Sequence, residues 1–467
     1  MTQPNTEFDI SIIGSGPGGY VAAIKASKMG LRTVLIEENE IGGLCLNWGC
    51  IPSKALLKNA QVINLFKKAE EFGITYSNPH YDFGKGLARS RRVVQRLVRG
   101  INFLLKKNNV QVLKGRAEIK DSKRLEVNLS GDNLQTIHSD NTIIATGASH
   151  RNIPGIEPNG STIITSREAL DLPNVPTSLL ILGGGATGVE FSYIYNTYGS
   201  EVTVVETRDN ILPNEDEEIS KQLEGSLTKL GINILTKSRV LSISNGPDHM
   251  VVELETPNGI QTIEVQKILV AAGIIGNTKN IGLENIGLIP QDTFIKVDSS
   301  MRTSVDGLYA IGDVTGILPL AHVASAQAMI AVDDILGIPT HPIDYAYIPK
   351  ATYCDPQVAS FGYSEKMADE LGLSVRVGKF PFRANGKALA IGENEGLIKI
   401  LFDSLTGSII GAHMVGSDVT ELLAQITMTS KLGGSFEDLA QMTYSHPTLS
   451  EMIKEAALDT TGQSIHT

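Results

Sequence analysis

Two stretches of the chain share one pattern of hydrophobic and polar positions. Each begins with a short apolar run, passes through a glycine-rich turn, continues with small residues at helical spacing, and reaches a second apolar run that ends in an acid. The first stretch covers residues 9–37 and the second covers residues 179–206. Short apolar runs rich in Val and Ile are typical of parallel strands that are covered on both faces. The pattern therefore predicts an α/β chain with two doubly wound, Rossmann-like domains.

The glycines of both turns are spaced as in loops that bind dinucleotides. The first set is Gly14, Gly16 and Gly19 with the acid Glu37, and the second is Gly183, Gly185 and Gly188 with the acid Glu206. Such glycines bring a pyrophosphate close to a helix N-terminus, and the acid accepts hydrogen bonds from ribose hydroxyls. One glycine turn can bind nothing, but two complete copies predict two bound dinucleotides.

The acid of the second turn bears on the choice between NAD and NADP. A carboxylate repels a 2′-phosphate, so Glu206 favours NAD. Arg208 lies two residues further on and leaves the alternative open, because NADP sites usually offer an arginine at this place.

Residues 60–110 have a largely helical pattern. Four arginines recur at helical spacing, and beside them we expect an apolar face of Val93, Leu97, Ile101 and Leu104. The basic stripe consists of Arg89, Arg92, Arg96 and Arg99. It is either a solvated helix face, which is the simpler interpretation, or a docking site for an acidic partner.

The last quarter of the chain has a different pattern. Prolines around 340–350, like the Pro/Asn-rich stretch 151–160, indicate a domain junction. Short strands are predicted beyond it, followed by helices, which is typical of an α+β domain. These strands cover Gln357–Gly362, Ser374–Phe382, Leu397–Phe402 and Gly407–Met414.

Size and charge limit the possible functions. The 467 residues are too many for one core, and 42% hydrophobic with 19% charged residues is a globular balance. The net charge of −11 argues against nucleic acid or an anionic membrane as the main partner. The chain has no apolar run of about 18 residues, and its start has no charged-then-apolar leader. We expect a cytoplasmic protein, or an organellar one whose transit peptide has been removed, without a metal site.

Three cysteines are too few for a secreted disulfide scaffold. Cys45 and Cys50 lie five residues apart, just after the first acid and therefore near the first dinucleotide. In a chain of this class such a pair favours catalysis over a structural role. Cys354 is expected to be a small buried residue without a redox role.

The segment Cys45-Leu-Asn-Trp-Gly-Cys50-Ile-Pro-Ser-Lys54 resembles the active site of dihydrolipoamide dehydrogenases, within the pyridine nucleotide–disulfide oxidoreductase family. The resemblance extends along almost the whole chain. Residues 145–147 are similar to the strand that closes the FAD domain, and residues 306–313 to the second flavin motif. The segment 445–451 is similar to the catalytic His–Glu segment of the family, where Pro447 is suited to the first turn of a helix.

The resemblance implies four domains and a homodimer. It predicts an FAD-binding domain at 1–150, an NAD-binding domain at 151–273, a central domain at 274–345 that completes the FAD site, and a C-terminal dimerisation domain at 346–467. FAD would bind tightly but without a covalent bond. Each active site would be shared between subunits, and the lipoyl group would arrive on a lipoyl domain of a 2-oxoacid dehydrogenase or glycine cleavage complex.

The resemblance also implies roles for single residues. Cys45 and Cys50 would form a redox-active disulfide, His446 would be the acid–base residue oriented by Glu451, and Lys54 would pair with Glu190 near the flavin. Further cofactor contacts are implied at Gly115, Thr146, Gly147, Val240, Gly273, Asp313 and Ala321.

Three positions depart from the usual dehydrogenase pattern. Trp48 stands where a smaller residue is usual, Tyr444 replaces the first His of His-x-His-Pro, and the helix 321–327 is less charged. A reductase for another small disulfide remains the alternative within the family, although Glu206 argues against the NADP-preferring glutathione type. A flavin-bound structural subunit is a second alternative, which the intact Cys45, Cys50, His446 and Glu451 disfavour.

Overall fold

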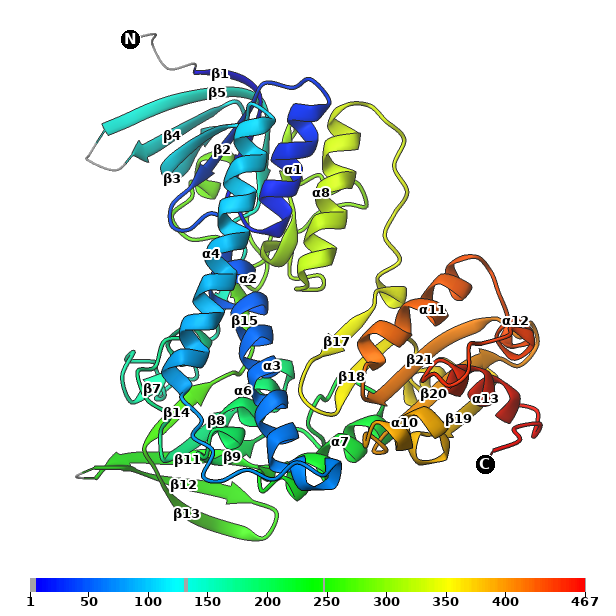
Figure 1. Cartoon of the computed structure of the whole chain (residues 1–467). Coiled ribbons are helices and arrows are strands. Elements are labelled where there is room, and N and C mark those ends of the chain that lie inside the picture. Colours follow the sequence, from blue (N-terminus) through cyan, green and yellow to red (C-terminus); the bar gives the residue numbers. More distant parts are fainter. Residues whose placement is uncertain (1–5, 130–132, 247, 467) are drawn as a thin grey trace. The chain divides into compact units, whose positions relative to one another are not determined.

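The computed structural model in Figure 1 describes residues 6–129, 133–246 and 248–466. The chain divides into two compact units. Unit 1 comprises Met1–Ala55, Lys85–Arg151 and Gly273–Ile343, and unit 2 comprises Leu56–Gly84, Asn152–Ala272 and Asp344–Thr467. The expectation about a leader falls mostly on residues 1–5, which lie outside the described residues. The division into four domains with assigned cofactors stays a prediction.

Unit 1 is built on a parallel sheet in the order β3–β2–β1–β5–β16. Beyond their parallel parts, β3 and β5 continue and pair with β4 in an antiparallel meander. A separate antiparallel pair joins β6 and β15. The strands are β1 (Glu7–Ile13), β2 (Thr33–Glu37), β3 (Gln111–Asp121), β4 (Arg124–Leu129), β5 (Asn133–Ile144), β6 (Ala148–His150), β15 (Ile274–Gly276) and β16 (Leu308–Ala310).

Small residues allow two helices of unit 1 to pack closely. Figure 1 shows α1 (Pro17–Lys28) and α8 (Ala321–Ile335) side by side, and their contact faces carry buried alanines. A Cβ atom on Gly18 would lie 3.3 Å from the carbonyl oxygen of Ala324, so only glycine fits there without a shift. This close packing brings the segment 308–316 against the start of α1, where the first glycine turn lies.

The buried face of α4 (Phe83–Lys107) differs from the predicted one. Val94, Ile101 and Leu105 are buried, whereas Leu97 and Leu104 are 41% and 42% exposed. Apart from Ile101, the predicted positions lie one residue before the buried side of the helix, which turns the face by about 100° at 3.6 residues per turn. The buried face also contains the polar Ser90, which an apolar pattern cannot reveal. The four arginines of the basic stripe are exposed, and their role in docking stays a prediction.

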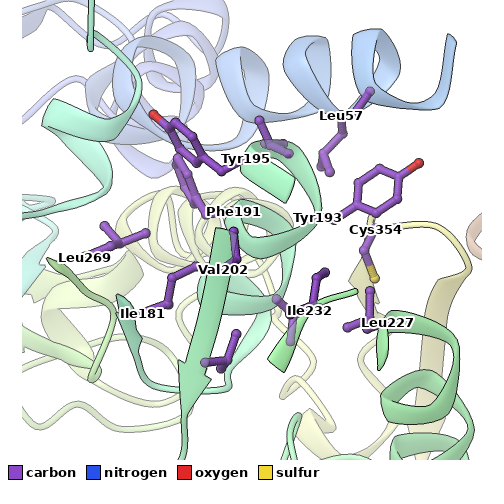
Figure 2. Packing of buried hydrophobic residues seen from close by; sticks show 14 of the residues in the cluster. Leu57, Ile181, Phe191, Tyr193, Tyr195, Val202, Leu227, Ile232, Leu269 and Cys354 are labelled. Carbon is purple, nitrogen blue, oxygen red and sulfur yellow. The ribbon is translucent and has the colours of Figure 1, made fainter. Parts of the chain in front are cut away.

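The part of unit 2 at residues 152–272 contains a second parallel sheet, in the order β10–β9–β8–β14–β7, and an antiparallel sheet β11–β12–β13. Figure 2 shows its core, where side chains of α6 and the sheet pack with Leu57 of α3 and Cys354. The elements are β7 (Ile163–Ile164), α5 (Ser166–Ala169), β8 (Ser178–Leu182), α6 (Ala186–Thr197), β9 (Glu201–Val205), α7 (Glu217–Lys229), β10 (Asn233–Leu235), β11 (Arg239–Asn245), β12 (Met250–Thr256), β13 (Gly259–Val265) and β14 (Lys267–Val270).

The C-terminal part of unit 2 is an antiparallel sheet in the order β17–β18–β21–β20–β19 with helices, as the α+β prediction required. All four predicted strands are confirmed within two residues at each end. The elements are β17 (Lys350–Thr352), β18 (Gln357–Gly362), α9 (Glu365–Glu370), β19 (Val375–Pro381), α10 (Gly386–Ala390), β20 (Leu397–Asp403), β21 (Ile409–Gly416), α11 (Val419–Lys431), α12 (Phe436–Gln441) and α13 (Glu451–Asp459).

The remaining helices are short or link the two units. α2 (Gly43–Trp48) and α3 (Cys50–Lys67) follow each other directly, and the unit boundaries fall inside α3 and α4. Among the described residues, no helix combines the length and the apolar character that a membrane span requires. The 3₁₀ helices are η1 (Ala69–Phe72), η2 (Leu283–Ile286), η3 (Gly312–Thr315), η4 (Tyr345–Tyr347) and η5 (Phe382–Ala384).

Candidate active site

The first glycine turn lies between β1 and α1 and has the geometry of a dinucleotide loop. Gly14 has a φ of +99°, and a Cβ atom there would come within 2.3 Å of the Ala145 carbonyl oxygen. A Cβ atom on Gly19 would lie 1.9 Å from the Gly14 carbonyl oxygen. Around Gly16, which precedes the first residue of α1, a Cβ atom would meet open space. The turn therefore leaves room for a pyrophosphate at the start of α1.

A pocket of about 390 Å³ lies beside the end of β2, where Glu37 stands. Glu37 is buried, and its Oε2 atom accepts the Ser15 N–H at 2.8 Å. The size and the mixed polar and apolar lining suit part of a nucleotide. The lining residues are Glu37, Asn39, Glu40, Ile41, Asn47, Val98, Asn102, Val112 and Lys114.

The segment that carries the two cysteines is docked on this turn. The Gly42 N–H donates to the Ser15 carbonyl oxygen at 3.1 Å and lies 3.2 Å from the Ser15 Oγ. A Cβ atom on Gly43 would lie 2.7 Å from the Gly16 Cα. Both Gly42 and Gly43 have positive φ, so this approach requires glycine. The turn that would hold a pyrophosphate and the cysteine segment thus form one packed structure.

Cys45 and Cys50 stand close together on two helices that meet at Gly49. Both are thiols, Cys45 within α2 and Cys50 as the first residue of α3. The hydrogen bond with Cys50 and then burial raise the pKa of Cys45, while the ammonium of Lys54 acts against them. The partial positive charge at the start of α3 favours a thiolate on Cys50.

The other residues predicted to contact the first dinucleotide also lie in unit 1. The Thr146 hydroxyl donates to the Asn277 carbonyl oxygen at 2.8 Å, next to Gly147 with its φ of +71°. Asp313 lies in η3, and burial raises the pKa of its carboxyl group. A half-buried acid favours a polar partner, which a sugar or ribityl hydroxyl would supply. The remaining predicted cofactor contacts in unit 1 are Lys54 in α3, Gly115 in β3 and Ala321 at the start of α8, together with Gly273 before β15, which was predicted as the last residue of the NAD-binding domain.

The second glycine turn repeats this geometry in unit 2. Gly183 has a φ of +114°, Gly185 precedes α6, and a Cβ atom on Gly188 would lie 1.9 Å from the Gly183 carbonyl oxygen. The buried Glu206 accepts the Gly184 N–H at 2.7 Å and the Arg208 N–H at 2.8 Å.

The Arg208 guanidinium donates to Asn214 at 3.1 Å, so this side chain does not pair with Glu206. The buried Glu190 in α6 accepts the Tyr353 N–H at 3.0 Å, and Val240 lies in β11. The predicted pairing of Glu190 with Lys54 stays a prediction.

His446 and Glu451 form a hydrogen-bonded pair, with 2.9 Å between Nδ1 and Oε1. Glu451 also accepts the Thr448 N–H at 2.8 Å. Partial burial acts to raise the pKa of Glu451, but the Thr448 N–H and His446 outweigh it, so that the pKa lies below its usual value. The imidazole is 80% exposed. Because Nδ1 bonds to Glu451, Nε2 is the ring nitrogen that can exchange a proton with a bound molecule. This is the arrangement of an acid–base histidine held by a carboxylate.

One local prediction about this segment is wrong. Pro447 does not lie in the first turn of the helix, because α13 begins only at Glu451. Glu451 accepts the Thr448 N–H, and this bond holds residues 447–450 in a turn before the helix. Glu451 is thus the first helical residue, four positions later than Pro447.

Sequence reasoning missed several residues that build the two sites. Asn39, Asn102 and Lys114 line the pocket, and Gln327 accepts the Gly312 N–H at 2.6 Å and so fixes η3. Asn39 follows the carboxyl end of β2, and Lys114 lies in the neighbouring strand β3. Their position at that sheet edge was a signal that could have identified them.

Comparison with known families agrees with this geometry. Residues 8–328 match the pyridine nucleotide-disulphide oxidoreductase family, and residues 348–457 match the dimerisation domain of the same family. The family binds FAD and a pyridine nucleotide. The dimerisation domain implies a homodimer.

Curated relatives span the whole chain. A dihydrolipoyl dehydrogenase of Rhizobium etli is 42% identical over 98% of this chain and 99% of its own length, and one of Chlorobaculum tepidum is 42% identical with the same coverage.

Two solved structures are similar in fold. LpdA from Mycobacterium tuberculosis has a TM-score of 0.89 and 30% identity over 97% of this chain and 99% of its own. The HOCl-induced flavoprotein disulfide reductase RclA from Escherichia coli has a TM-score of 0.86 and 29% identity over 96% and 99%. The chain belongs to the pyridine nucleotide–disulphide oxidoreductase family, as a flavoprotein disulfide reductase of its dihydrolipoyl dehydrogenase group.

Proposed function

We propose that the protein oxidises dihydrolipoamide to lipoamide through a Cys45–Cys50 disulfide and FAD, with NAD as the electron acceptor. The observation that carries the proposal is the docking of the two cysteines on the first glycine turn, through Gly42 and Gly43. A dithiol pair held against a dinucleotide loop can exchange electrons with a bound flavin. The choice of substrate rests on the full-length relatives that are named dihydrolipoyl dehydrogenase.

In the proposed reaction, His446 first removes a proton from one thiol of dihydrolipoamide. The resulting thiolate attacks the Cys45 sulfur, a mixed disulfide forms, and Cys50 leaves as a thiolate. The second substrate thiol then attacks the substrate sulfur of the mixed disulfide, and its proton passes to the departing Cys45 sulfur, which leaves as a thiol. Lipoamide leaves with one new S–S bond, and the cysteine pair has gained two electrons. FAD, when bound, supplies the two-electron chemistry that links the thiols to NAD.

The cofactor and nucleotide sites are assigned by the two loops. The pocket beside Glu37, with Asp313 and Thr146 in the same unit, fits FAD, and the loop around Gly183 to Gly188 fits the pyridine nucleotide. Glu206 favours NAD, because both its oxygens accept backbone N–H groups, which keeps a carboxylate where a 2′-phosphate would lie.

The proposed active site is shared in a dimer, in which His446 of one subunit serves the disulfide of the other. The exposure of the imidazole is consistent with such a role. The lipoyl group would be carried by a lipoyl domain of a 2-oxoacid dehydrogenase or glycine cleavage complex, in the cytoplasm.

The first test is NADH formation from dihydrolipoamide, with NAD and NADP in parallel. Turnover with NAD alone is expected. Equal rates with NADP would contradict the role of Glu206 and leave the disulfide chemistry intact. No turnover by an FAD-loaded protein that still reduces another small disulfide would contradict the choice of substrate.

The roles of single residues are tested with matched variants. Cys45→Ser should abolish dihydrolipoamide oxidation, whereas Cys354→Ser, at a buried cysteine in the core of unit 2, should retain it. His446→Gln should lower the rate about 10²–10⁴-fold. Reduction of an artificial acceptor by NADH does not need the disulfide and should change much less. His466→Gln is the control, because His466 pairs with Glu455 one turn further along α13. An equal loss in both assays for His446→Gln would contradict its role.

A further inference from the structure

Three consecutive residues of α4 contact the segment that carries the two cysteines. Each donates a side-chain hydrogen bond to a backbone carbonyl oxygen, one in α2 and two in α3. The bonds join Arg91 Nη1 to Asn47 O at 2.7 Å, Ser90 Oγ to Pro52 O at 3.4 Å, and Arg89 Nη1 to Ala55 O at 3.2 Å. All of these residues belong to unit 1. We call residues 89–91 the α4 clamp.

The strongest contact of the α4 clamp is made by Arg91. Its guanidinium carbon lies 4.3 Å from the ring centre of Trp48, in a cation–π arrangement, while Nη1 donates to the Asn47 carbonyl oxygen. Trp48 is fixed from another side, because its indole N–H donates to Glu40 Oε1 at 3.3 Å. Asn47 and Trp48 are the last two residues of α2, so Arg91 binds the C-terminal end of that helix.

The position of α2 against α3 depends on contacts of this kind. Only Gly49 separates the two helices, and its φ of −136° and ψ of −113° interrupt the helical hydrogen bonds. Cys45 lies on one side of this break and Cys50 on the other. No continuous series of helical hydrogen bonds joins α2 to α3. Because α4 binds both helices, it can set the separation of the two sulfurs.

We propose that Arg91, stacked on Trp48, is a positioning residue that holds α2 against α3 and thereby sets the thiol–disulfide equilibrium of Cys45 and Cys50. The proposal rests on the redox role proposed above for this pair. It also assigns a purpose to Trp48, the residue between the cysteines that departs from the usual pattern of the family. A tryptophan offers the largest aromatic face for a guanidinium.

Two effects of Arg91 on the equilibrium have opposite signs. Holding the sulfurs close raises their effective concentration and favours the disulfide. A positive charge stabilises a thiolate and favours the reduced pair. The positive charge of Arg91 interacts with the Trp48 ring and the Asn47 carbonyl oxygen, so that its electrostatic effect on the two sulfurs is weaker. We therefore expect positioning to dominate, so that the disulfide becomes less stable when Arg91 is replaced.

The experiment measures disulfide formation in the FAD-bound dimer, equilibrated with oxidised and reduced dithiothreitol and trapped by alkylation. The reaction is balanced: the two thiols of the protein become a disulfide as one oxidised dithiothreitol becomes a dithiol. Arg91→Met should lower the equilibrium constant about tenfold, which corresponds to about 30 mV for a two-electron couple. Arg92→Met, at an exposed neighbouring position on α4, should leave the constant unchanged.

Arg91→Lys separates positioning from charge. Lysine keeps the charge but lacks the planar fork that stacks and donates at once. Under the proposal, Arg91→Lys and Arg91→Met both lower the constant. A constant that rises in Arg91→Met and is unchanged in Arg91→Lys would assign a purely electrostatic role and overturn the proposal, and so would no change in either variant.

Trp48 provides an independent measurement, should an Arg91 variant fail to bind FAD. Trp48→Leu should lower the constant in the same direction, Trp48→Phe should lower it less, and Arg91→Met added to Trp48→Leu should have little further effect. Additive effects would contradict a joint role. If the wild-type pair forms no disulfide at all, the proposed function fails. If it forms one with the same constant in every variant, only the positioning role fails.

Discussion

The two glycine turns of this protein have nearly the same backbone but different surroundings. In both, the first glycine has a positive φ, +99° at Gly14 and +114° at Gly183. In both, the last glycine lies so close to the first that an added Cβ atom would stand 1.9 Å from its carbonyl oxygen. Their acids also act alike, since each accepts the N–H of the residue after the first glycine. The shared part is what any dinucleotide requires of a strand–turn–helix unit.

The difference lies in the residue after the first glycine. In the first turn this is Ser15, whose hydroxyl donates to Glu37 at 2.6 Å and lies 3.2 Å from the Gly42 nitrogen. In the second it is Gly184, whose carbonyl oxygen accepts the N–H of Leu212, at the start of a turn that leads to α7. The first turn thus contacts the cysteine segment, whereas this contact of the second turn leads to α7. Under the proposed function, only the first turn would be in contact with the residues that exchange electrons with the substrate.

The largest effect is expected from the last glycine of each turn. Gly19→Ala should prevent FAD binding and with it all activity, because the Cβ atom and the Gly14 carbonyl oxygen cannot both keep their places. Gly188→Ala should leave FAD bound but abolish reduction of the flavin by NADH. Flavin absorbance of the purified variants and its bleaching by NADH check both.

Two glycines with free space around an added Cβ atom serve as controls for the Gly19 and Gly188 variants. Gly100 in α4 and Gly225 in α7 have no atom near an added Cβ, so alanine should be tolerated there, with up to about 1 kcal/mol of gain in stability. If Gly188→Ala lost FAD as well, the two turns would not bind their dinucleotides independently of each other.

The second largest effect is expected for the ion pair between Asp216, at the start of α7, and Lys399 of β20. Asp216 caps α7 and is bonded to the buried Lys399 of β20, with Nζ–O distances of 2.9 and 3.0 Å. Burial acts to raise the pKa of Asp216, but Lys399 outweighs it and lowers the pKa below its usual value. Lys399→Met would leave a buried unpaired carboxylate and should cost about 3–5 kcal/mol at pH 7.

The sign of the pH dependence follows from the lowered pKa of Asp216. A group whose pKa is lowered by folding stabilises the protein above its unfolded value, about 3.9, and this contribution is lost as the pH falls through the lower folded value. In Lys399→Met, protonation of the unpaired Asp216 should instead reduce the penalty at low pH. Thermal unfolding at pH 7 and pH 4 checks this: the deficit of the variant should shrink at pH 4. Lys379→Met, on the neighbouring strand β19, breaks a partly exposed pair with Glu218 of α7 and should cost less than about 1 kcal/mol.

The acids of the two turns predict different losses of specificity. Glu206→Gln should reduce the preference for NAD over NADP about tenfold, because the charge that repels a 2′-phosphate is removed while one acceptor oxygen remains. Glu37→Gln should weaken FAD binding and leave the nucleotide preference unchanged. The ratio of kcat/KM for the two nucleotides is the measurement. A changed ratio in Glu37→Gln would show that the acids do not act separately.

The sequence was sufficient for the parts of this comparison that depend on local spacing. Each turn is a continuous strand–turn–helix unit, so the glycines, Glu37 and Glu206 could be predicted together. The bond between Gly42 and Ser15 spans 27 residues, and that between Arg91 and Asn47 spans 44. A serine among glycines, and an arginine beside a basic stripe, gave no sign of either contact.

Other parts of the fold show the same limit. The predicted apolar face of α4 included the buried Ile101 but missed Ser90 and Arg91, which contact the cysteine segment, because hydrophobicity does not report polar contacts. The start of α13 was predicted at Pro447, but the helix begins at Glu451. The bond between Glu451 and the Thr448 N–H, which holds the preceding turn, forms only in the folded protein. Spacing predicts elements and local motifs, whereas the contacts that join them depend on tertiary structure.

The smallest effect, and the most direct test of the difference between the turns, is expected from Ser15→Ala. The variant keeps the backbone bond from Gly42 but removes the hydroxyl that touches both Glu37 and the Gly42 nitrogen. A hydrogen bond to a charged group contributes about 1.5–3 kcal/mol, but Glu37 keeps its bonds to the Ser15 and Asn39 N–H groups. The net loss should therefore be nearer 1 kcal/mol, about fivefold in FAD affinity, with a parallel decline in dihydrolipoamide turnover. Ser139→Ala removes another buried hydroxyl of unit 1, bonded to Ser11, and should lower stability without changing FAD affinity. If Ser15→Ala weakened FAD binding but left disulfide chemistry untouched in the FAD-loaded fraction, the first turn would be as independent of the redox segment as the second turn is.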